Sequence, residues 1–391
     1  MRHFYTRFLL PVGLLAGTII GAGVFALPYA FYRSGIATGV LYLILGAALY
    51  TLLHLLYADV IVRTEGDHRF VGYARMYLGR FAGGFALLMT AVGMLFTLTI
   101  YLVLSVSFIN FFLPEGAAAL KILIFWALGS VAVFLNAKKL ALSEFLVTLA
   151  IVAIIGSIFF IGAPQFFLSH ISLTLSTNVI LFLFPLAPIL FALSGRVAIP
   201  VLAKYFKSLR DGHDYKGMRR AIIWGTCIPA CLYLLFVIGV LGISHIPTED
   251  AVAGLSAFLS PLMLLVLGIL GFLSLWSSYI AVGTDTLASL GYDLKFSPFM
   301  RSLVVIAGPL ILYFGGFTHF LKLVSLTGGI FAACEGILIL LFWLSARKRA
   351  PSAKVFSVHP LTIALGCIIL IVALVYESLA HFLWYSRSLK F

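Results

Sequence analysis

The sequence predicts an all-α, polytopic membrane protein, and three observations support this. Of its 391 residues, 63% are hydrophobic and 10% are charged, and the mean hydropathy is +1.15. Soluble domains carry about 25% charged residues. The apolar residues form continuous runs of helix length for a hydrocarbon core of about 30 Å, without the alternation of barrel strands. Because spanning backbone must hydrogen-bond internally, we expect a helical bundle.

Each predicted span is one apolar run between polar loops. We expect about eleven spans, of which 301–316 is short for a crossing. The whole chain, 1–391, then forms one integral membrane domain. In chain order the predicted spans are 8–31, 36–62, 82–112, 119–135, 142–163, 179–202, 220–243, 260–290, 301–316, 319–344 and 358–383.

The basic residues predict the orientation. The net charge is +13, and most lysines and arginines fall in the inner loops if the N-terminus is cytoplasmic, as the positive-inside rule requires. We therefore read the charge as a topology signal and expect no nucleic acid partner. The first run is too long for a cleavable signal peptide and is read as a retained anchor. We expect a multi-pass protein of the plasma (cell inner) membrane.

Two spans are interrupted by glycine and proline at corresponding places. The first contains GTIIGAGVFALP, Gly17 to Pro28, and the sixth contains FALSGRVAIP, Phe191 to Pro200. Such pairs point to a transporter binding site between two repeats. We expect five-helix repeats at 8–163 and 179–344, the second inverted because each has an odd number of spans, and an extra helix at 358–383.

The first break exposes both backbone donors and acceptors. Glycine is costly within a helix and lets the backbone leave helical geometry. Amides at the start of the outer half-helix would favour a carboxylate, and carbonyls at the end of the inner half would suit a cation. A small-residue packing face is the alternative. The candidate residues are Thr18, Ile20, Gly21, Ala22, Gly23 and Val24.

The sixth break offers the complementary groups. An interruption at Ser194-Gly195 would free carbonyls that accept from an ammonium group. Amides at one break and carbonyls at the other match the carboxylate and amine of an amino acid. Phe191 could cover the site as a lid, or face lipid or the core. The candidate residues are Phe191, Ala192, Ser194 and Gly195.

Arg196 lies within the sixth span, where an arginine costs at least about 2.5 kcal/mol. It needs an acidic partner or an anionic substrate. Asp285 and Glu335 are the candidates at comparable depth, and Asp59 and Glu377 lie nearer span ends. A buried carboxylate can carry a proton through a transport cycle. The alternative is a static ion pair that only fixes helix packing.

Hydroxyl-bearing residues mark two other spans. Ser277 and Ser278 could complete an oxygen cage with first-span carbonyls, including that of Ile20, or bond back to their own helix. In the third span, Thr97, Thr99 and Tyr101 are possible lining residues. His54 is an alternative proton site.

The motifs also resemble those of a known superfamily. GTIIGAGVFALP resembles the first-span signature of the amino acid–polyamine–organocation (APC) superfamily, and its Ala-Leu-Pro ending looks most like the aromatic and hydroxy amino acid permease and amino acid/auxin permease branches. FALSGRVAIP and Ser277-Ser278-Tyr279 are similar to the sixth and eighth spans of those branches. The resemblance implies the leucine-transporter fold and alternating access.

The resemblance also assigns roles. It implies that Gly21-Ala22-Gly23 holds the carboxylate, that Phe191, Ala192 and Ser194 hold the amine and gate the site, and that Ser277 and Ser278 lie where sodium-coupled relatives bind the cation. Many relatives carry another residue where this chain has Arg196. The fixed positive charge of Arg196 favours proton coupling or exchange over sodium coupling. The arginine could also recognise a second carboxylate on the substrate.

We therefore expect a secondary active amino acid transporter with proton-coupled uptake. A sodium symporter and an exchanger are the nearest alternatives, and a membrane sensor or scaffold of the same fold is an alternative of another class. We expect no enzyme and no cofactor, because the sequence has no P-loop, no H-E-x-x-H and no nucleophile–base cluster. The expected partners are an amino acid, a proton or sodium ion, and the lipid bilayer.

Overall fold

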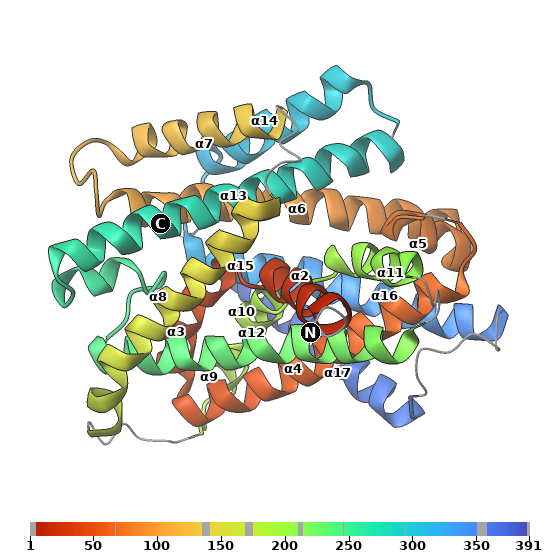
Figure 1. Cartoon of the computed structure of the whole chain (residues 1–391), viewed down its shortest axis with the longest axis horizontal. Coiled ribbons are helices and arrows are strands. Elements are labelled where there is room, and N and C mark those ends of the chain that lie inside the picture. Colours follow the sequence, from red (N-terminus) through yellow and green to blue (C-terminus); the bar gives the residue numbers. More distant parts are fainter. Residues whose placement is uncertain are drawn as a thin grey trace.

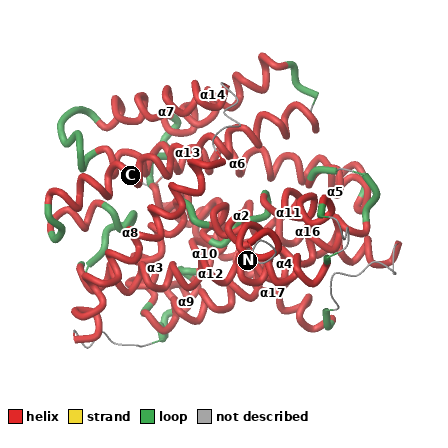
Figure 2. Tube along the Cα trace, viewed as in Figure 1, coloured by secondary structure: helices red, strands yellow, loops and turns green. Residues whose placement is uncertain are grey.

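The computed structural model of the chain describes residues 5–66, 68–134, 141–168, 175–209, 214–244, 246–293, 295–349 and 358–388. Residues 135–140, 210–213 and 350–357, which hold basic residues of three predicted inner loops, lie outside it. Within the described ranges the protein consists of helices and loops, with no strand (Figure 2).

Every predicted span coincides with a helix or an interrupted helix. Among the described residues, seven helices are long and apolar enough to cross a membrane, and the bent first pair would add an eighth. Shorter apolar helices, Ala118–Phe134, Val179–Ala192 and Pro298–Phe314, occupy three further predicted spans. The uninterrupted spans are α4 (Ile36–Arg63), α6 (Arg80–Ile109), α7 (Ala118–Phe134), α8 (Ala141–Leu168), α12 (Tyr215–Ile243), α13 (Pro261–Asp293), α14 (Pro298–Phe314) and α17 (Pro360–Ser388).

Three spans are interrupted. The first runs through η1 (Tyr5–Leu9), α2 (Leu10–Ile19), η2 (Ala22–Ala26) and α3 (Leu27–Ser34). The sixth runs through α9 (Val179–Leu183), α10 (Leu186–Ala192) and α11 (Ala198–Ser208). The tenth runs through α15 (Phe320–Leu326), a π-helix η5 (Thr327–Ala332) and α16 (Ala333–Arg349). Two short helices, α5 (Phe70–Leu78) and η4 (Ala253–Ala257), lie in the connections.

The interrupted helices occupy the middle of the bundle. In Figure 1, α7 and α14 lie along one edge, next to α6 and α13, while α4 and α12 run along the other side. Between these layers α10 packs against η2, α4, α15 and η5, and α12 packs against α2 and α8. The breaks are therefore surrounded by protein, as irregular backbone at membrane depth must be. The repeat boundaries stay a prediction.

Candidate functional site

The first span breaks at the predicted glycines. Helix α2 ends at Ile19, η2 begins at Ala22, and the two halves of the span are bent by 51°. Gly21 between them is extended, with φ −152° and ψ −154°. The Val24 amide donates to the Gly21 carbonyl at 3.4 Å within the short 3₁₀ turn. The sequence predicted that amides at the start of the outer half-helix are free to bind a carboxylate. The Val24 amide differs from this prediction, because it already donates to a backbone carbonyl.

The two breaks lie directly against each other. A Cβ added at Gly23 would stand 2.8 Å from Ala192 Cβ and nearer still to Ala192 Cα. A Cβ added at Gly195 would stand 2.6 Å from Ile19 Cγ1. Real Cβ contacts are longer, so both glycines permit the close approach of the first and sixth spans. They act as packing glycines in this conformation.

Gly21 is less crowded than Gly23 and Gly195. A Cβ at Gly21 would meet nothing closer than 4.0 Å, and one of the two atoms at that distance is the Tyr101 hydroxyl. The Tyr101 hydroxyl also lies close to Ser278. Gly21, Tyr101 and Ser278 thus border one polar region beside the first break.

The sixth span unwinds between Ala192 and Ala198. The Ser194 amide donates to the Phe191 carbonyl at 3.3 Å, and the Ala198 amide donates to the Gly195 carbonyl at 3.1 Å. Pro200 lies in the first turn of α11, where its missing N–H costs nothing. Phe191 is half-buried at the end of α10. The helix is interrupted here, and the Phe191 carbonyl already accepts one backbone hydrogen bond.

Tyr233 of α12 joins the two breaks. Its hydroxyl lies 2.7 Å from the Ile19 carbonyl and 3.0 Å from the Ala192 carbonyl, and its side chain is fully buried. The single hydroxyl hydrogen of Tyr233 thus lies between two of the carbonyls that the sequence predicted as cation or ammonium acceptors. A buried tyrosine hydroxyl usually has a hydrogen-bond partner, but the position of Tyr233 in the sequence does not show which group that partner is.

Arg196 pairs with Glu335 of α16. Its Nε and a terminal nitrogen each lie 2.8 Å from a carboxylate oxygen, a two-pronged contact, and the two side chains are only 11% and 15% exposed. Thr90 donates to the same carboxylate at 3.1 Å, and the guanidinium lies 4.4 Å from the Phe70 ring centroid. Charge, hydrogen bonds and ring contact together offset the cost of burying the arginine.

The other acidic residues that the sequence predicted as possible partners of Arg196 each contact a different basic residue. Asp285 lies 3.5 Å from Arg69, whose other contact is Ser289 at 3.1 Å. Asp59 pairs with Arg63 at 2.8 Å and accepts from the Trp343 indole at 2.7 Å. Glu377 contacts His381 at 3.1 Å. Among the described acids, the geometry selects Glu335 as the partner of Arg196.

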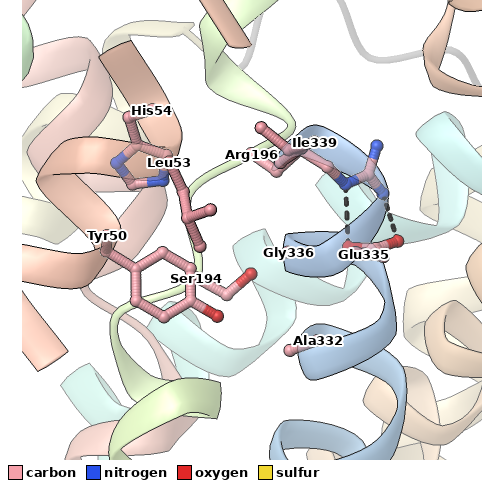
Figure 3. A pocket seen from close by; sticks show the side chains of 9 residues that line it. All are labelled: Tyr50, Leu53, His54, Ser194, Arg196, Ala332, Glu335, Gly336 and Ile339. Atoms are coloured by element: carbon pink, nitrogen blue, oxygen red, sulfur yellow. Dashed lines mark hydrogen bonds and ion pairs between the residues drawn. The ribbon is translucent and has the colours of Figure 1, made fainter. Parts of the chain in front are cut away.

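A small cavity of about 10 Å³ lies beside the Arg196–Glu335 pair. Figure 3 shows the hydroxyls of Tyr50 and Ser194 on one side of it, the ion pair on another, and the His54 ring above them. The apolar part of its lining consists of Leu53, Ala332, Gly336 and Ile339. The sequence predicted Ser194, Arg196 and Glu335 at this place, whereas Tyr50 was missed because a single tyrosine in an aromatic-rich span carries little signal.

Several predicted lining residues are placed away from the breaks or bond to their own helix. Thr18 is exposed and donates to the Leu14 carbonyl at 2.9 Å, so the structure does not bring its side chain to the site. Thr97 and Thr99 each donate to the carbonyl four residues earlier, at 2.9 Å. Ser277 is buried and Ser278 is half-buried on α13, with Tyr101 between Ser278 and the first break. No group of three or more metal-ligating side chains occurs in the described part of the chain.

The sequence and the fold both match known transporters. The model of the tryptophan/tyrosine permease family matches residues 5–379. The chain belongs to this family. It is therefore a multi-pass secondary transporter and not an enzyme. No curated protein sequence matches the chain.

Three solved structures illustrate the fold. Mhp1, a nucleobase-cation-symport-1 family transporter with bromovinylhydantoin bound, has a TM-score of 0.64 at 15% identity, covering 97% of this chain and 93% of its own. MhsT with L-phenylalanine has a TM-score of 0.64 at 14% identity, covering 95% and 97%. The Eremococcus coleocola manganese transporter, in complex with an aromatic bis-isothiourea substituted compound, has a TM-score of 0.62 at 13% identity, covering 94% and 84%. At such identities the likeness shows the leucine-transporter fold alone.

Proposed function

We propose that the protein carries aromatic amino acids, tryptophan or tyrosine, into the cell by alternating access at the two breaks, and that a proton drives uptake. The observation that supports this most is the direct contact of the two broken helices through Gly23, Ala192 and Gly195. A change in that contact would alter the backbone groups at both breaks together. The family description, tryptophan/tyrosine permease, supports the substrate class.

The substrate position follows from the space around the first break. A Cβ would fit at Gly21 in ordinary contact, whereas at Gly23 and Gly195 it would collide with the neighbouring span. We place the carboxylate near Gly21 and Ala22, at the start of the outer half of the span, where the backbone dipole favours an anion. The amine would bind near Ala192 and Ser194, and there it would compete with the Tyr233 hydroxyl for the Ala192 carbonyl. Phe191 would act as the lid.

The surroundings of the first break also suit an aromatic side chain. Phe25 of η2 makes edge-to-face contacts with Phe108 at 5.2 Å and with Phe236 at 5.5 Å between ring centroids. Aromatic pairs of this geometry stabilise by about 0.5–1.5 kcal/mol beyond their burial. A substrate ring that enters beside the outer half-helix would meet the same kind of surface.

The proposed orientation follows the basic loops. We place the N-terminus in the cytoplasm and the protein in the plasma membrane. Arg69, which follows α4 in a predicted inner loop, reaches Asp285 of α13. This contact joins an inner loop to the inner end of a span, as the proposed orientation requires.

Uptake into proteoliposomes tests the proposal. Purified protein should concentrate labelled L-tryptophan or L-tyrosine when a pH gradient is imposed, and should exchange it against unlabelled amino acid without a gradient. Gly21→Ala should raise KM with little loss of stability, because its Cβ enters the proposed carboxylate position. Binding of amino acid without uptake or exchange would instead favour a sensor, and uptake driven only by sodium would refute proton coupling.

A further inference from the structure

The hydrogen bonds of His54 determine which ring nitrogen carries the proton. His54 is 1% exposed in α4, and its Nδ1 lies 3.0 Å from the Thr226 hydroxyl of α12. That hydroxyl has one hydrogen, and it lies 2.9 Å from the Ile222 carbonyl in the geometry of a donor. The hydroxyl therefore accepts from His54, which makes Nδ1 the protonated nitrogen of the neutral ring. Nε2 then carries a free lone pair.

This second nitrogen has no hydrogen-bond partner among the described residues, although it is fully buried. His54 lines the small cavity beside the Arg196–Glu335 pair, together with Tyr50 and Ser194 (Figure 3). Buried polar atoms without a partner are rare and call for an explanation. The cavity has about the volume that one water molecule requires, and Tyr50, His54, Ser194, Arg196 and Glu335 are the residues with polar groups in its largely apolar lining.

Protonation of the nearby acids would disturb ion pairs that they already make. Protonation of Glu335 would break its two-pronged contact with Arg196 and leave a buried guanidinium without its counter-charge, which costs about 3–5 kcal/mol. Asp285 makes a longer and more exposed contact with Arg69, at 3.5 Å. A proton on His54 Nε2 leaves the ring's own hydrogen bond in place, because Nδ1–H keeps its acceptor at Thr226.

The charges around His54 are compatible with a proton there. The titratable or charged groups that share its cavity are Tyr50, Arg196 and Glu335, and Cys227 follows Thr226 on α12. Arg196 opposes a second cation, whereas the carboxylate of Glu335 attracts it. A protonated His54 would therefore compete with Arg196 for Glu335 and loosen the ion pair between the sixth and tenth spans.

We propose that His54 is the residue that binds and releases the coupling proton, an inference that rests on the transport activity proposed above. The Nε2 lone pair accepts a proton from cavity water, and the neutral ring becomes an imidazolium. Glu335 turns toward this new cation, so that Arg196 and the break beside it can move. When the cavity opens to the other side, Nε2 returns the proton to water, and the Arg196–Glu335 contact forms again.

Reconstituted protein and a pH gradient of about two units test the inference with labelled L-tryptophan. One proton per substrate allows up to about 100-fold accumulation under this gradient. We expect His54→Gln to lose accumulation above equilibrium, so that its residual transport runs only downhill. The matched control is His319→Gln, which changes an exposed histidine at the start of α15 and should accumulate like the wild type. Thr226→Val should move half-maximal uptake to a lower external pH, because the imidazolium loses an acceptor.

A measurement on the wild-type protein covers the case in which His54→Gln does not fold. Addition of L-tryptophan should make the medium outside the proteoliposomes more alkaline, and Thr226→Val should shift the pH range of this signal. Full accumulation by His54→Gln would overturn the inference. Exchange of tryptophan by the wild type without any response to pH would also overturn it, while the proposed transport would stand. Absence of both uptake and exchange in the wild type would overturn the proposed function and the inference together.

Discussion

Replacement of Gly23 by alanine tests how closely the two broken helices must approach. The added Cβ would lie 2.8 Å from Ala192 Cβ and nearer to Ala192 Cα. An ordinary carbon contact is about 3.5–4.0 Å, so one of the backbones must move by about 1 Å. Because the obstacle is backbone and not a flexible side-chain end, we expect a loss of stability of about 1–3 kcal/mol, as in overpacked cores.

Gly21→Ala is the matched control for this change. It adds the same methyl group two residues away, where nothing lies closer than 4.0 Å. Thermal unfolding of both purified variants in one detergent should show a lower midpoint for Gly23→Ala and a midpoint near wild type for Gly21→Ala. Exchange of labelled tryptophan should fall strongly in Gly23→Ala. Equal midpoints and equal exchange in Gly23→Ala and the wild type would show that the close contact is not needed.

Three further variants test contacts around the breaks. Tyr233→Phe removes the hydroxyl that lies between two carbonyls and should cost about 1–3 kcal/mol and slow exchange. Tyr205→Phe, which loses a single hydrogen bond near the N-terminus, should leave exchange intact. Equal exchange in both variants would refute a role of Tyr233 in joining the two breaks. Glu335→Gln leaves a buried arginine without its counter-charge and should lower the stability to thermal unfolding by about 3–5 kcal/mol. Asp285→Asn, whose ion pair is more exposed, should lower it by less than about 1 kcal/mol. Arg196→Lys keeps the charge but loses the two-pronged contact, so wild-type uptake in this variant would show that the contact geometry is unimportant.

Much of the fold was predictable because the bilayer restricts the choices. A continuous apolar run of spanning length can only be a helix, and the predicted spans coincide with helices or interrupted helices. The breaks were also predictable, since Gly21-Ala22-Gly23 and Ser194-Gly195 combine glycine with a following proline. The π-helix at Thr327–Ala332 was not predicted; within it Gly328 lies so close to α10 that an added Cβ would meet the Ala187 carbonyl.

The chemistry of the site was only partly predictable. The sequence named Arg196 and offered Asp285 and Glu335 as partners, but the choice between them depends on how far each helix is rotated and shifted along its axis. Gly21 and Gly23 look alike in the sequence, yet a Cβ would fit at Gly21 and would collide with Ala192 at Gly23. Tyr233 carried no signal at all, because nothing in its own span shows that its hydroxyl reaches two carbonyls on other helices.

The sequence by itself determined that the chain is a bundle of membrane helices with two breaks at matching places. These properties follow from local causes: hydrophobic length, backbone freedom at glycine and the missing N–H of proline. Only the tertiary structure decided that the breaks face each other, that Tyr233 joins them and that Glu335 pairs with Arg196. It also decided that one ring nitrogen of His54 is buried without a hydrogen-bond partner among the described residues. Each of these is a contact between segments far apart in the chain, and such contacts depend on helix packing, which no single span encodes.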